Sequence, residues 1–247
     1  MQRGLKDKTV LVVGAANAVG AAVARRLAAQ GAKLALVDSD GGALTALAGE
    51  IGGAVLTITA DTTDPRSAKT VAEQARARYG EIHVLVNNVT DPVGHGLEGV
   101  SLDSFTAAVS GTLGVQFAFM REVVPAMRKQ GYGRVVNLSG LGYLGLPGGA
   151  ETAAAQSGIF GLTRSLALEG ARDHVTVNTV VKGDLASPGQ SEEDGAKVAA
   201  GVPVKRLGTA DDIAYAVSFF ASDASKYVTG QTFFVCGGKS AYFSMSV

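Results

Sequence analysis

The amino-terminal part of the chain alternates a short apolar run, a glycine-rich turn and a helical pattern, and this unit constrains the fold most strongly. The run TVLVV at 9–13 is rich in β-branched residues and precedes the turn GAANAVG at 14–20. AAVARRLAAQG at 21–31 has helical apolar spacing, and LALVD at 34–38 forms a second apolar run that ends in an acid. The segment therefore predicts a strand, a helix and a second strand.

The same alternation continues to the end of the chain. Further strands are expected in AVLTITAD, IHVLVNN, GRVVNLSG, HVTVNTVV and QTFFVCGG, and helices in SAKTVAEQARARYG, in a long stretch that opens at Ser101, in ETAAAQSGIFGLTRSLALEGA and in DDIAYAVSFFAS. Such regular alternation predicts a doubly wound, Rossmann-type parallel sheet with helices on both faces, a three-layer α/β/α fold. We expect a single domain over residues 1–247, a kink at Pro125, and a mobile polar lid at 183–201.

Composition excludes several classes of function. Charged residues are 18% and hydrophobic residues 47% of the 247 residues, which supports a large core and argues against disorder. Lys and Arg number 22, as do Asp and Glu, so there is no net field to attract nucleic acid or an anionic membrane. The single cysteine, the absence of an apolar leader and the absence of a run long enough to span a bilayer predict a cytoplasmic protein.

Four segments resemble the short-chain dehydrogenase/reductase family: the glycine turn, NNV at 87–89, YLGLPG at 143–148 and the stretch 203–238. In that family the turn reads TGxxxGxG and binds the pyrophosphate of a nicotinamide dinucleotide on backbone N–H groups. Val13 replaces the threonine here, and Ala18 replaces the middle glycine. The resemblance therefore places a methyl group where the backbone normally approaches the cofactor.

The resemblance implies either a weak NAD site or a scaffold that no longer binds a cofactor. Asp38 stands where an acid accepts hydrogen bonds from the adenosine ribose and repels a 2′-phosphate, which favours NAD over NADP. Asp61 matches the acidic adenine contact. The full set implied as cofactor-binding, vestigial or weak, is Gly14, Asn17, Ala18, Val19, Gly20, Asp38, Asp61 and Asn87.

The residues that the family uses for chemistry are replaced. The expected YxxxK motif reads Thr152 to Gln156, and the family's helix asparagine falls at Thr112. Only Ser139 matches the substrate-orienting serine, and a second alignment puts Gly140 there instead. A threonine hydroxyl is a far weaker acid than a phenol, and a neutral glutamine cannot lower its pKa. We therefore expect no intact catalytic set.

A displaced set could still perform the reaction. Tyr143 follows Ser139 on the cleft rim, and Lys182, which stands in the family's Pro-Gly position, could meet it; alternatively, Tyr143 is a packing aromatic and Lys182 a solvated charge. The spacing of His83, His95 and His174 indicates no metal site. Cys236 is expected to be a buried apolar residue rather than a nucleophile.

Three functions remain open at this point. The favoured one is a non-catalytic subunit that supports or regulates an active NAD-dependent alcohol or hydroxyacyl-CoA dehydrogenase paralogue, through the helices at about 101–130 and 151–171 and the carboxyl-terminal strand. In the residues lost, the chain resembles the inactive subunit of a heteromeric hydroxyacyl-CoA dehydrogenase of anaerobic toluene breakdown by way of benzylsuccinate. The alternatives are an active oxidoreductase that uses Ser139, Tyr143 and Lys182, and an NAD(H)-binding sensor without chemistry.

Overall fold

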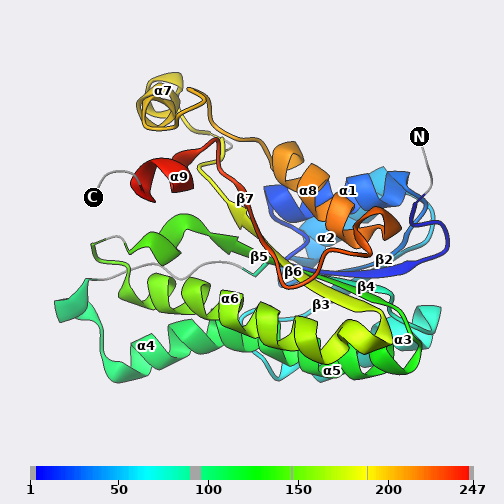
Figure 1. Ribbon diagram of the computed structural model, residues 1–247. Helices are drawn as coiled ribbons and strands as arrows, with labels where there is room; N and C mark the ends of the chain where they lie inside the picture. The colour runs from blue at the N-terminus through cyan, green and yellow to red at the C-terminus, as the bar shows by residue number, and fades with distance from the viewer. Residues whose placement is uncertain (1–3, 90–95, 146, 188, 245–247) are drawn as a thin grey trace.

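The computed structural model describes residues 4–89, 96–145, 147–187 and 189–244, with side chains described to residue 241 (Figure 1). His95 and part of the expected lid and tail lie outside the described residues. Seven parallel strands form one sheet in the order β3-β2-β1-β4-β5-β6-β7. The strands are β1 (Thr9–Val13), β2 (Lys33–Asp38), β3 (Val55–Thr59), β4 (Val84–Asn87), β5 (Gly133–Gly140), β6 (Val175–Lys182) and β7 (Thr232–Val235).

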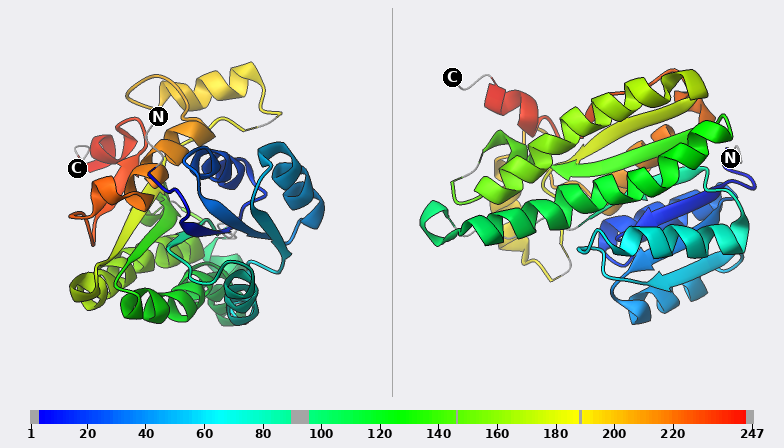
Figure 2. Two further views of the ribbon diagram at one scale, coloured as in Figure 1. Left: turned by 90° about the vertical axis from the view of Figure 1, so that its right-hand side faces the viewer. Right: turned by 90° about the horizontal axis from the view of Figure 1, so that it is seen from below.

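Helices cover both faces of the sheet, so the predicted doubly wound three-layer fold is confirmed (Figures 1 and 2). One layer holds α1 (Ala18–Ala29), α2 (Gly41–Ile51) and α8 (Ala210–Ala221). The other holds α3 (Ser67–Tyr79), α4 (Leu102–Val109), α5 (Val115–Lys129) and α6 (Ala150–Gly170). Two short helices, α7 (Glu192–Ala200) and α9 (Lys239–Ser244), lie at the same end of the molecule (Figure 1). In the described part of the chain, no helix has the length and apolarity that a membrane crossing requires.

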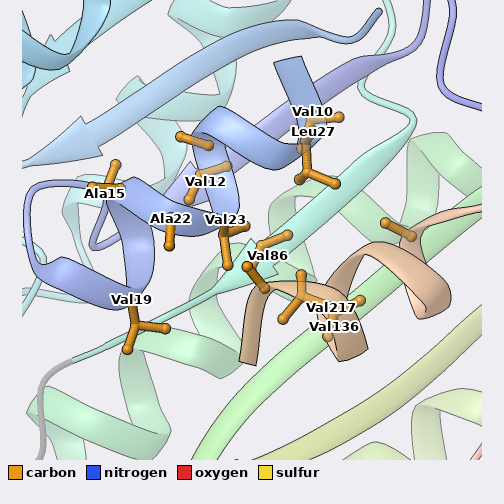
Figure 3. Close-up of a cluster of buried hydrophobic side chains, with 14 of the residues drawn as sticks. Val10, Val12, Ala15, Val19, Ala22, Val23, Leu27, Val86, Val136 and Val217 are labelled. Carbon is orange, nitrogen blue, oxygen red and sulfur yellow. The ribbon is translucent and has the colours of Figure 1, made fainter. Parts of the chain in front are cut away.

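Alternation along β1 divides the core into two clusters. Val10 and Val12 pack toward α1 and α8, where Val217 completes the contact (Figure 3). Leu11 and Val13 face the other layer and join the cluster that contains α3, α5 and α6. Because both faces of β1 are buried, the strand is apolar throughout instead of alternating with polar residues.

Three details differ from the expectation. Helix α2 was not predicted, because GGALTALAGEI begins with two glycines, which disfavour helix. The long helix from Ser101 is interrupted by a π-helical turn at Ser110–Gly114, whereas α5 continues through Pro125. The expected lid contains an ordered helix, α7, whose amino terminus is capped by Ser191.

Gly20 makes the tightest backbone approach that the fold requires. A Cβ at this position would lie 2.0 Å from the carbonyl oxygen of Gly14, whereas a Cβ on Gly49 in α2 would meet nothing within 4 Å. Gly20→Ala should therefore destabilise the protein by about 3 kcal/mol or more, since the backbone has to shift. Gly49→Ala should stabilise it by about 0.5–1 kcal/mol, because alanine is the better helix former. Urea unfolding of both variants tests the pair; equal effects would contradict the packing at Gly20.

His83 links stability to pH. Its Nδ1 accepts the backbone N–H of Thr9 at 3.1 Å, and burial, together with Lys8, lowers its pKa. The folded state thus favours neutral imidazole, so this contribution is present above the unfolded pKa of about 6.5 and is lost as pH falls through the lower folded pKa. In His83→Asn the amide oxygen can accept the same N–H without titrating. The variant should show a smaller loss of unfolding free energy between about pH 7.5 and 5; an unchanged loss would rule out this role.

Candidate active site

A cleft of about 760 Å³ lies at the carboxyl ends of the strands, beside β1 and β4, where the strand order reverses. This is the position at which doubly wound sheets bind their ligands, and the volume is that of a typical small-molecule site. Its lining residues come from the glycine turn and the end of β4, and from the end of β5, the turn after it and α6. Others come from the end of β6, the segment after it, α7 and α9. Together they are Asn17, Ala18, Val19, Val89, Gly140, Leu141, Gly142, Leu144, Thr152, Gln156, Lys182, Gly183, Asp184, Leu185, Ala186, Ser187, Val198 and Lys239.

The glycine turn is held by side chains at both of its ends. Gly14 adopts φ +74°, a conformation that favours glycine, and its N–H donates to the Val37 carbonyl at 2.9 Å. Asn17 caps α1 by accepting the N–H of Gly20 at 3.0 Å. Asn88 Nδ2 donates to Gly14 O at 2.8 Å and to Asn17 Oδ1 at 3.0 Å. The sequence motif at 87–89 includes Asn88, but the residues predicted to bind the cofactor included only Asn87 of this pair.

Two carboxylates lie at the end of β2 and just after β3, and the Asp38 carboxylate contacts the glycine turn. Asp38 Oδ2 accepts the N–H of Ala16 at 2.9 Å, and Oδ1 accepts the N–H of Ser39 at 2.8 Å. Oδ1 also accepts the Ser39 hydroxyl and the N–H of Asp40, both at 3.4 Å, so Oδ2 is the oxygen that could accept a further hydrogen bond, such as one from a ribose hydroxyl. Asp61 accepts the backbone N–H and the hydroxyl of Thr63, and these bonds lower its pKa. Neither carboxylate is among the residues that line the cleft, but Asp38 contacts the glycine turn that borders it.

Asn87 belongs to a buried polar ladder rather than to the cleft wall. Its Nδ2 donates to Asn137 Oδ1 at 2.9 Å, and Asn137 Nδ2 donates to Thr163 Oγ1 at 3.1 Å. The Thr163 hydroxyl bonds to that of Thr179 at 2.7 Å. Asn87, Asn137 and Thr179 occupy paired positions of β4, β5 and β6, so the ladder ties three strands and α6 together below the cleft.

The four positions that the sequence predicts to be degenerate catalytic ones divide into two pairs. Thr152 and Gln156, on the first turns of α6, line the cleft. Ser139 and Thr112 are only 3% and 4% exposed; the Ser139 hydroxyl donates to the Gln156 carbonyl at 3.5 Å, and Thr112 lies inside the π-helical turn. The side chain of Gln156 is 4% exposed and lies over Gly140 and Gly142, at 2.8 Å from where a Cβ on either would stand.

Tyr143 and Lys182 have different surroundings. The phenol ring packs against Phe160 and Phe234, with ring centroids 5.1 and 5.7 Å apart, while Lys182 lines the cleft. Burial raises the pKa of Tyr143, and Cys236 raises it further. A catalytic phenol needs the opposite shift, so this geometry favours the packing role of Tyr143 over the displaced catalytic set.

An ion pair joins α9 to the segment that follows β6, beside the cleft. Lys239 Nζ in α9 lies 2.5 Å from Asp184 Oδ2, and both residues line the cleft. Val198 of α7 also lines it, so the segment expected to form a lid does border the site. The sequence contains no signal for this pair, because its partners are 55 residues apart and each resembles a solvated surface charge.

A family model and several named proteins match most of the chain. A family model described as Enoyl-(Acyl carrier protein) reductase matches residues 14–240. The chain is 51% identical, over 100% of both chains, to (2S)-[(R)-hydroxy(phenyl)methyl]succinyl-CoA dehydrogenase subunit BbsC of Thauera aromatica. It is 31% identical to subunit BbsD of the same organism, over 97% of this chain and 99% of that one. The crystal structure of levodione reductase superposes with a TM-score of 0.90, at 30% identity, over 96% of this chain and 99% of the other.

Substitution of Ala18 tests whether its methyl group weakens the binding of a dinucleotide at the glycine turn. It is the first residue of α1, is exposed and lines the cleft, so its methyl group borders the space above the turn. Ala18→Gly should strengthen NADH binding about tenfold, the value of about 1.4 kcal/mol of relieved crowding. Fluorescence titration of NADH with both proteins measures the change, and Gly49→Ala serves as a remote control. Equal affinities would show that this methyl group does not limit binding.

Proposed function

The chain belongs to the short-chain dehydrogenase/reductase family, and from this premise we propose that it is a non-catalytic subunit of a heteromeric dehydrogenase that oxidises an aryl-substituted hydroxyacyl-CoA. An active paralogue would perform the redox step, and this chain would support or regulate it. The observation that carries the proposal is the pair Thr152 and Gln156, which lines the cleft in place of tyrosine and lysine.

The missing groups are those that move a proton. Oxidation of an alcohol requires a group that accepts the hydroxyl proton near neutral pH, and the loss of general acid–base catalysis costs roughly 10² to 10⁴ in rate. The hydroxyl of Thr152 is a far weaker acid than a phenol, and the Gln156 amide carries no charge to activate it. The packing of Tyr143 against Phe160 and Phe234 supports no substitute.

The relatives support a partner of the same family. Both BbsC and BbsD are named as subunits of one dehydrogenase, and the chain is similar to each over nearly its full length. The helices expected to pair carry an apolar groove of about 500 Å³, lined by Phe105, Val109, Leu113, Phe117 and Leu162 among others. Phe233 on β7 is 51% exposed. These faces fit burial against a paralogue.

A nicotinamide dinucleotide, if bound, would accept or donate hydride. In this chain the glycine turn would hold its pyrophosphate, Asp38 its ribose, and Asn17 and Asn88 would keep the turn in shape. The intact hydrogen bonds of the turn favour one second candidate, an NAD(H)-binding sensor without chemistry. Saturable NADH binding by the wild-type chain would support the sensor, and its absence would support a pure scaffold.

Co-purification from the native host tests the assembly. A tagged copy of this chain should recover a second short-chain dehydrogenase of similar length, and the recovered particle should reduce NAD with a hydroxyacyl-CoA substrate. A Phe233→Asp variant places a charge on the exposed β7 surface, at the proposed carboxyl-terminal contact, and should recover less partner. A homo-oligomer that holds no second protein would contradict the proposal.

Restoring the missing pair should not restore turnover. Thr152→Tyr with Gln156→Lys returns the two residue types and keeps Ala18 at the cleft; if the Ala18 methyl blocks the nucleotide, NAD reduction by the isolated variant should stay at background. A matched control, Thr152→Phe with Gln156→Met, has similar bulk without the proton chemistry. Activity in the Tyr/Lys variant alone would show that the turn accepts NAD as it stands.

A further inference from the structure

We propose that Tyr143 is a positioning residue for the wall of the cleft and ties that wall to the edge strand β7, so that a partner packed on β7 changes the cleft. The inference rests on the proposed function, which places a partner contact at β7, and it adds how that contact regulates the cleft. The role belongs to the ring of Tyr143 and involves no proton transfer from its hydroxyl.

Tyr143 belongs to a 3₁₀ turn, Leu141–Leu144, whose three other residues line the cleft. Its ring packs against Phe160 of α6, with ring centroids 5.1 Å apart and planes at 73°, and against Phe234 of β7, at 5.7 Å and 44°. Aromatic pairs in these geometries contribute more than the burial of their area. One ring thus joins the cleft wall to a helix and to the edge of the sheet.

The turn has little freedom on its cleft side. A Cβ on Gly142 would lie 2.7 Å from Cγ2 of Thr152 and 2.8 Å from Oε1 of Gln156, so the backbone of the turn lies directly against two side chains of the cleft. Close-packed groups transmit a displacement, because no space between them absorbs it. A shift of Tyr143 therefore changes the surroundings of Thr152 and Gln156.

Strand β7 presents one aromatic ring to each layer of helices. It is the last strand of the sheet, next to β6, and successive side chains of a strand point to opposite faces (Figure 1). Phe233 packs against Phe220 of α8, with ring centroids 5.8 Å apart, whereas Phe234 packs against Tyr143. Phe233 is 51% exposed and Phe234 38%. The two neighbours are therefore both accessible to a partner, and Phe234 is the one that contacts the cleft turn.

A partner on β7 would strengthen the contact between Phe234 and Tyr143. Covering the exposed part of Phe234 removes it from water and restricts its ring, which favours the arrangement of the turn that the ring pair holds. Coupling of this kind is reciprocal, so a ligand that fixes the turn would strengthen the assembly by the same factor.

Hydrogen exchange of the backbone amides of Leu141–Leu144, in the purified full-length chain, tests the positioning role. Tyr143→Ala and Phe234→Ala should each speed this exchange about three- to tenfold, the range expected for loss of an aromatic pair. Phe233→Ala removes the neighbouring exposed ring and should leave the turn unchanged. Tyr143→Phe keeps the ring and should match the wild-type chain. Tyr143→Leu replaces the alanine variant if that variant does not fold.

Three results would overturn the positioning role. The first is unchanged exchange of the turn in Tyr143→Ala or Phe234→Ala. The second is an equal effect of Phe233→Ala, which would indicate a general loss of stability. The third is faster exchange in Tyr143→Phe, which would assign the effect to the hydroxyl instead of the ring.

The particle isolated with its partner tests the coupling. In the wild-type particle the turn should exchange about three- to tenfold more slowly than in the isolated chain, and a particle made with Phe234→Ala should lose this protection. Equal protection in both particles would overturn the coupling. Recovery of no second dehydrogenase would contradict the proposed function and the coupling with it, whereas exchange in the isolated chain would still decide the role of Tyr143.

Discussion

The close approach of α1 to the end of β1 is the constraint on which the site depends. Gly20 leaves no room for a side chain against the Gly14 carbonyl, and Asn88 fastens the same turn through Gly14 and Asn17. The amino terminus of α1 is therefore held at the point where the strand order reverses. The cleft at the carboxyl ends of the strands follows from this junction, whichever ligand it takes.

The fold could be predicted further than the site. Apolar runs such as 9–13, separated by helical spacing, are enough to indicate a parallel sheet, because burial on both faces leaves a clear signature. The direction of Tyr143 could not be predicted, since spacing along a loop does not say which way a side chain turns. The replacement of YxxxK at Thr152 and Gln156 was visible in the sequence. That Gln156 fills the floor over Gly140 follows only from the packing.

Some polar residues could have been found from the strands themselves. Asn137 and Thr179 interrupt apolar runs that are buried on both faces, and a buried polar side chain in such a strand needs a partner. Their pairing with Asn87 depends on strand order and register, which the sequence does not state. The pair Asp184 and Lys239 likewise becomes visible only once α9 is placed beside the cleft.

Under the proposed function, the chain separates two properties that an enzyme combines, a shaped binding cleft and a group that moves a proton. Binding energy alone does not accelerate a reaction unless it increases toward the transition state. The most direct test is NAD reduction by the purified chain alone, given a hydroxyacyl-CoA substrate and saturating NAD, beside the same assay on the particle isolated with its partner. The account predicts reduction only by the particle; sustained reduction by the chain alone would contradict it.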